Sequence, residues 1–290
     1  MKLRSLYPAI LIISFFLMPG LGLTKDQVKI SAQQDSIVDE LAGTIIFKKN
    51  VLAELASGGI LKTDQLNIYI NKLRKPEKAV GDGHVVFEKD GLVGSCDKAI
   101  IIKKNNTAEL FNLVHIRYQE SWIKAHHVKY DYELGNGIIK GNLKKPVSFY
   151  YKSVDEKTNE QNIIKGKSNQ ISINQIKQEI LFQGSVFMED SKSNSIIQTH
   201  HLLVNYNIKK EIEKIYANGA FIHKQDDRKS FSDRAILDYK KEVITLIGNA
   251  RVESEEGILQ SSRIEMYMKS SKGVIKAEKN KPLKIEIELE

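Results

Sequence analysis

Hydrophobic and polar residues alternate along most of the chain. The segments 66–70, 128–132, 171–173 and 264–266 place an apolar side chain at every second position, which is the period of a half-buried β-strand. Apolar residues at the three-four spacing of a helix are hard to find. The pattern therefore predicts an all-β protein built from strand pairs.

A phrase of a small residue followed by alternating apolar residues returns at steps of about 30 to 40 residues. Its anchors are Gly43, Gly83, Gly184, Gly219 and Gly248, with weaker copies at Asn112, Gly141 and Ala277. The second half of each repeat begins with a polar residue, followed two and four positions later by apolar ones. These polar residues are Asp64, Asp97, His126, Asn169, His200, Asp233 and Ser262. Such a period predicts a stacked array with one continuous apolar face.

Turns and insertions follow from the residues between the strands. Four dipeptides are typical of hairpin turns: Asp82-Gly83, Asp90-Gly91, Asn136-Gly137 and Asn218-Gly219. The charged stretches 71–80 and 153–162 are interpreted as insertions in the array, because the repeat resumes after each of them.

The alternation also predicts which side chains share the apolar face. They are Ile45, Phe47, Leu66, Ile68, Val85, Phe87, Ile101, Val128, Tyr130, Leu202, Val204, Phe221, Leu237 and Ile264. These residues either line a trough for a lipid or pack against each other as a closed core. Both environments are apolar, so the sequence leaves the two alternatives open.

The chain begins like a secreted protein. Residues 1–22 contain a charged start with Lys2 and Arg4, a short apolar run and small residues at its end, the arrangement of a cleavable signal peptide. An uncleaved anchor is the alternative. Residues 23–290 are expected to form the repetitive β region, either as one body or as two fused halves near 23–152 and 163–290.

Charge and reactive side chains exclude several functions. The formal charge is +8, but the cations are spread among 36 acidic residues, which argues against nucleic acid and fits an anionic lipid better. Cys96 is the single cysteine, so no internal disulfide forms.

No nucleophile motif is present, and we expect no catalytic residue. The pairs His126-His127 and His200-His201 each offer one side chain per strand face, so we expect neither a metal nor another cofactor. A polysaccharide-cleaving enzyme using Asp82, Asp90 and Asp97 is the minor alternative; acids at turns are more often turn formers.

Residues 42–47, 247–252 and 232–239 resemble those of the OstA-like family, the periplasmic lipopolysaccharide-transport bridge proteins of the LptA type. The similarity extends over residues 25–279. It implies an elongated open β-jelly roll whose interior holds acyl chains, and which adds end to end through its edge strands. The family also contains a membrane-anchored sister of the LptC type, which leaves open the role of the C-terminal half.

The combined prediction is a non-enzymatic periplasmic carrier that moves lipopolysaccharide from the inner to the outer membrane. The resemblance implies that its partners are lipopolysaccharide, the transport components of both membranes and further copies of itself in a head-to-tail array. The alternative is a secreted β-solenoid scaffold or adhesin without lipid cargo.

Overall fold

The computed structural model describes residues 28–56, 58–154, 161–208, 211–255, 257–268, 273–276 and 284–286. Every regular element in these ranges is a β-strand, and every strand pair with a defined register is antiparallel. The all-β prediction is therefore confirmed. The described ranges contain no helix long and apolar enough to cross a bilayer, and the predicted signal peptide at 1–22 lies outside them.

The contacts divide the described chain into two compact units. The N-terminal unit contains residues 28–147 together with 172–176, and the C-terminal unit contains 148–171 and the residues from 177 onward. The fused halves expected near 23–152 and 163–290 stay a prediction, because a division by contacts does not show that either part folds separately.

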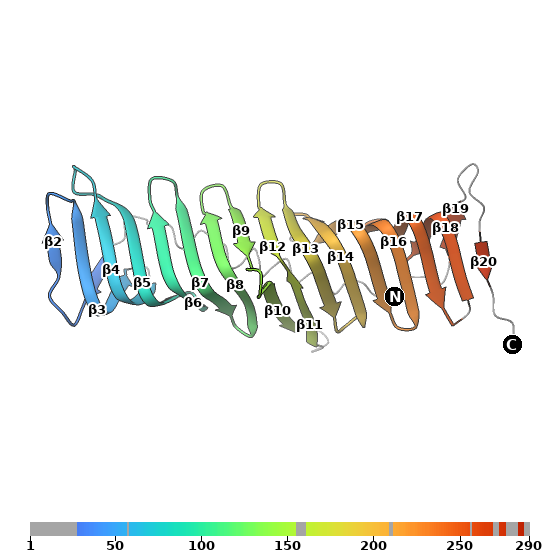
Figure 1. Ribbon diagram of the computed structural model, residues 1–290, viewed down its shortest axis with the longest axis horizontal. Coiled ribbons are helices and arrows are strands. Elements are labelled where there is room, and N and C mark those ends of the chain that lie inside the picture. The colour runs from blue at the N-terminus through green and yellow to red at the C-terminus, as the bar shows by residue number, and fades with distance from the viewer. Residues whose placement is uncertain are drawn as a thin grey trace. The chain divides into compact units, whose positions relative to one another are not determined.

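The N-terminal unit (blue to green in Figure 1) is a meander of antiparallel strands. Its strands are β1 (Val28–Ser31), β2 (Ile37–Asp39), β3 (Thr44–Leu55), β4 (Ile60–Ile70), β5 (Pro76–Lys89), β6 (Leu92–Ile102), β7 (Thr107–Tyr118), β8 (Ser121–Asp131) and β9 (Asn136–Lys140). Each strand from β3 to β9 pairs with the next along the chain. The short strands β2 and β1 pair with the first and second halves of β3.

The C-terminal unit repeats this plan. Its strands are β11 (Gln161–Ser168), β13 (Glu179–Asp190), β14 (Ser195–Tyr206), β15 (Ile212–Gln225), β16 (Arg228–Asp238), β17 (Val243–Ser254), β18 (Gly257–Tyr267), β19 (Gly273–Lys276) and β20 (Lys284–Glu286). β11 pairs with β13, β13 to β18 pair in order, and β18 pairs with β19 and β20. The remaining strands, β10 (Val147–Val154) and β12 (Gln170–Asn174), contain residues of both units.

The pairing register shifts near the middle of each long strand pair, and the extra residue of the β-bulge lies in alternate strands. In alternate strands the bulge consists of two consecutive residues with positive φ. These pairs are Lys49-Asn50, Gly83-His84, Asn112-Leu113, Gly184-Ser185, Gly219-Ala220 and Gly248-Asn249. A bulge bends and twists the strand that carries it. The recurring glycines of the sequence therefore mark the bends of the sheet.

The bulge glycines are required because a polar side chain of the preceding strand lies against each of them. A Cβ atom on Gly219 would lie 2.8 Å from Nδ1 of His200, and one on Gly248 would lie 2.5 Å from Oδ2 of Asp233. In the same way, a Cβ atom on Gly83 would collide with the side chain of Asp64, and one on Gly184 with that of Asn169. In these four repeats the polar residue that opens the second half thus packs on the next bulge.

Three details of the sequence prediction are wrong. Asp82-Gly83 and Asn218-Gly219 lie inside β5 and β15, whereas Asp90-Gly91 does form the turn between β5 and β6. Asn136-Gly137 begins β9, so the preceding turn lies before it. Gly43 is not equivalent to Gly83, because Gly43 precedes β3 and the bulge of β3 lies at Lys49 and Asn50. A bulge and a hairpin turn both require positive φ, so glycine by itself does not distinguish them.

Candidate functional site

The N-terminal unit contains an apolar cavity of about 1100 Å³. Both halves of the bent strands form its wall: β3 contributes Ile45 and Phe47 before its bulge, and Ala53 and Leu55 after it. Pockets for drug-sized ligands measure roughly 300–1,000 Å³. The cavity is therefore large enough for a long apolar ligand, and it agrees with the open jelly roll that the resemblance implies.

Most of the predicted apolar face in this unit lines the cavity. The lining residues that the sequence predicted are Ile45, Phe47, Leu66, Ile68, Phe87, Ile101, Val128 and Tyr130. Val85 faces inward from β5 but is fully buried in the packing of the wall. The predicted side chains are thus brought together on one surface; their contact with lipid stays a prediction.

The sequence prediction missed part of the lining. The missed residues include Ala53, Leu55, Leu61, Ala79, Ala99, Ala108, Leu110 and Ile116. A two-residue bulge preserves the parity of the alternation, so Phe47 and Ala53 both point inward. Continuing the alternation through the bulges of β3 and β5 would have found Ala53, Leu55 and Ala79. In β4 the inward parity changes between Leu61 and Leu66, where the register shifts, so the alternation by itself does not find Leu61.

The five predicted residues of the C-terminal unit have a different environment. Leu202 and Leu237 are 0% exposed and Phe221 is 1% exposed, and Val204 and Ile264 are similarly buried. They pack as a closed core in this structure. The lipid contact predicted for them is untested.

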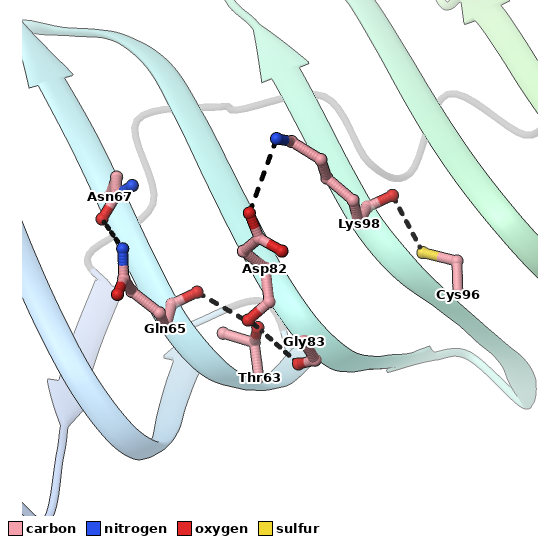
Figure 2. A network of polar contacts seen from close by, with 7 residues as sticks. All are labelled: Thr63, Gln65, Asn67, Asp82, Gly83, Cys96 and Lys98. Atoms are coloured by element: carbon pink, nitrogen blue, oxygen red, sulfur yellow. Dashed lines mark hydrogen bonds and ion pairs between the residues drawn. The ribbon is translucent and has the colours of Figure 1, made fainter.

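A small hydrogen-bond donor fixes the bulges. Thr63 is buried in β4, and its Oγ1 lies 3.0 Å from the carbonyl oxygens of Asp82 and Gly83 and 3.1 Å from that of Gln65 (Figure 2). Thr199 makes the equivalent contacts in the C-terminal unit, at 3.0 to 3.4 Å. This donor stands one position before the polar residues Asp64 and His200, a position that the sequence pattern did not single out.

Cys96 occupies the same place in β6. Its Sγ donates to the carbonyl oxygen of Lys98 at 3.3 Å, beside the ion pair of Lys98 with Asp82 at 3.5 Å (Figure 2). Burial raises the pKa of this thiol to about 11, so it is protonated and donates like a hydroxyl. Cys96 therefore has a structural role.

Ion pairs lie along the exposed side of the bulges. Nδ1 of His84 lies 2.7 Å from the carboxylate of Asp64, and this hydrogen bond raises the pKa of His84. Burial opposes ionisation of Glu109, but Lys129 at 3.0 Å and His127 at 3.4 Å hold its pKa below the usual value. Among the described residues no three potential ligands come together as a metal site.

Part of the chain matches a known protein family. Residues 157–272 match the family described as LptA/(LptD N-terminal domain) LPS transport protein. This segment, here called the LptA-type segment, is similar to that family. The resemblance found in the sequence is thereby confirmed over the matched residues, and for residues 25–156 it stays a prediction. The LptA-type segment lies almost wholly in the C-terminal unit, whereas the apolar cavity lies in the N-terminal unit.

A solved structure resembles the chain at low similarity. It is LptH, the LptA-homologous periplasmic component of the lipopolysaccharide transport device of Pseudomonas aeruginosa, with 11% identity and a TM-score of 0.36. The alignment covers 41% of this chain and 85% of LptH. No curated protein matches this chain in sequence.

The LptA-type segment contains a small cavity of about 70 Å³ with polar and apolar lining residues. His223 lines it beside Ser230, and the turn residues Asp226, Asp227 and Arg228 surround it. Burial, together with the charge of Arg228, lowers the pKa of His223 to about 4, and its Nε2 has no hydrogen-bond partner. The inner face of this unit therefore contains neutral polar groups as well as apolar ones.

Proposed function

We propose that this protein is a periplasmic carrier that passes lipopolysaccharide from the inner toward the outer membrane. The observation that carries the proposal is the apolar cavity of the N-terminal unit, with its volume of about 1100 Å³. Burying one methylene contributes about 0.8 kcal/mol, so about ten buried methylenes of an acyl chain contribute about 8 kcal/mol. The match of residues 157–272 to a family of lipopolysaccharide-transport proteins supports the same cargo.

Binding and release are sufficient for this function, and no chemical step is proposed. The charged residues of the cavity stand at its two edges, and the wall between them is apolar. The expected signal peptide at 1–22 supports a periplasmic location. The short outer strands, β1 and β2 in one unit and β19 and β20 in the other, leave backbone groups for β-augmentation by transport components or further copies.

The alternative of a scaffold without cargo is favoured by one observation, the closed core of the C-terminal unit. The two functions differ in whether lipid enters the N-terminal cavity. A photo-reactive benzoylphenylalanine at position 47, inside the cavity, should cross-link to lipid A in a Gram-negative host. The same residue at position 86 is the matched control, because Val86 lies on the outer face of β5 and is 37% exposed.

Mass spectrometry of the irradiated full-length protein identifies the adduct. We expect lipid A on the Phe47 variant and at most a trace on the Val86 variant. Equal adducts at both positions, or none at position 47 with excess lipid A, would sink the carrier proposal and leave the scaffold.

A further inference from the structure

One edge of the apolar cavity carries a tightly organised loop between β4 and β5. Oδ1 of Asn71 accepts the backbone N–H groups of Leu73 and Lys75, both at 3.0 Å. The N–H of Asn71 donates to the carbonyl of Lys75 at 2.9 Å, and that of Arg74 donates to the carbonyl of Asn71 at 2.8 Å. These bonds fix the loop backbone, and with it the positions from which Lys72 and Arg74 extend.

Three cations of this hairpin line the cavity. They are Lys72, Arg74 and Lys78, here called the cationic lip. The Lys78 ammonium lies 5.2 Å from the centre of the Tyr69 ring, a cation–π contact that holds it at the edge.

The carboxylates beside the lip are already engaged. Glu40 lies 3.7 Å from the Arg74 guanidinium in a highly exposed pair, and Glu77 accepts a hydrogen bond from Asn71 at 3.1 Å. The opposite edge of the cavity presents one charge of each sign, Glu88 and Lys89. The lip edge therefore carries three cations against the carboxylates of Glu40 and Glu77, a net charge of +1, whereas the charges of the opposite edge cancel.

A lipid whose chains fill the cavity keeps its polar head in water at an edge. Arginine and lysine bind phosphate through charge-assisted hydrogen bonds, and arginine does so in a bidentate manner. We propose that the cationic lip holds the phosphate groups of a phosphorylated glycolipid whose acyl chains occupy the cavity. The inference rests on the proposed function, and adds to it a fixed orientation of the cargo with its phosphates at β4 and β5. Arg74 exchanges its exposed partner Glu40 for phosphate when the lipid binds.

The test uses the full-length protein with benzoylphenylalanine at position 47 and measures the lipid concentration that half-saturates cross-linking. The lipids are diphosphoryl lipid A and the same lipid with both phosphates removed. In the K72Q/R74Q/K78Q variant at low salt, we expect half-saturation by diphosphoryl lipid A to need about tenfold more lipid, since three exposed ion pairs are lost. Half-saturation by the dephosphorylated lipid should not change. The difference should shrink as salt is added.

The matched control is K62Q/K103Q/K104Q, which removes the same charge at exposed lysines that do not line the cavity. We expect it to behave as the wild type. An equal increase of the half-saturating concentration in this control would overturn the proposed role of the cationic lip, and so would an equal increase for both lipids in the lip variant. In either case, cross-linking at position 47 would still support the carrier proposal. Inorganic phosphate at millimolar concentration should not compete; competition would assign the site to free phosphate and overturn the lipid proposal. Absence of cross-linking in the parent protein would overturn both proposals.

Discussion

The two units share one strand plan and differ in what fills the inner face. In the N-terminal unit Ile45 and Phe47 are partly exposed around an open cavity, whereas in the C-terminal unit Leu237 and Phe221 are sealed in a core. The bulges are the same in both units. The bend of the sheet therefore does not decide between a trough and a core; the volume of the inward side chains does.

Positions counted from the bulges show where the volume differs. The third residue after the first bulge is Ala53 in one unit and Met188 in the other. Ala79 and Ile215 each lie four residues before the second bulge of their unit. Ala108 and Ile244 each lie four residues before the third bulge. Three alanines of the cavity wall thus correspond to three large side chains in the closed core, and close packing leaves no space there.

The largest expected effect comes from exchanging these side chains. Ile244 is 2% exposed, and Ile244→Ala should lower the free energy of unfolding by about 2–5 kcal/mol because it leaves a void. Ala108→Ile should change it by less than about 1 kcal/mol, since the added atoms enter existing space. Urea denaturation followed by circular dichroism measures both, and fluorescence of the single tryptophan, Trp122, follows the N-terminal unit. Equal costs would show that the two inner faces are packed alike.

A smaller effect is expected from acidification. His223 of the C-terminal unit takes the place of Phe87 in the N-terminal unit, counted from their bulges. Its folded pKa of about 4 lies below the unfolded value of 6.5, so the unfolded state binds a proton first. The stability contributed by neutral His223 is present above pH 6.5 and is lost as the pH falls toward 4, by up to about 3 kcal/mol.

The pH dependence is measured as the urea midpoint of the wild type and of His223→Phe between pH 7 and pH 4. The urea midpoint of His223→Phe should fall less than that of the wild type between pH 7 and pH 4, because the variant lacks the group that is protonated on unfolding. If both proteins respond identically, His223 is not the group that titrates.

The smallest effect concerns the feature that the units share. Thr63→Val and Thr199→Val should each cost about 1–3 kcal/mol, because buried carbonyls lose their donor. Cys96→Ser is the control and should be nearly neutral, since a hydroxyl can donate to the same carbonyl of Lys98. Melting curves of the three variants test this; a cost confined to one unit would mean that the bulges are not equivalent.

Much of the fold follows from local pattern. Alternation at residues such as Ile45 and Phe47 predicted strands and their inward face, because a strand repeats every two residues. The donor Thr63 was not predicted, since the residue type at its position changes among repeats, from Thr63 to Cys96 and Thr199. Gly83 and Gly219 were found as repeat anchors but interpreted as turns, because the pairing partner that makes them bulges comes from other strands.

By itself, the sequence determined a β-protein of repeated antiparallel strand pairs with one apolar face and a glycine in most repeats. These properties depend on neighbouring residues and on the backbone preferences of glycine. Only the tertiary structure decided that this face opens into a cavity at Ala53, Ala79 and Ala108 and closes at Met188, Ile215 and Ile244. The physical reason is that a cavity depends on the combined volume of side chains from several strands, a quantity that no single strand contains.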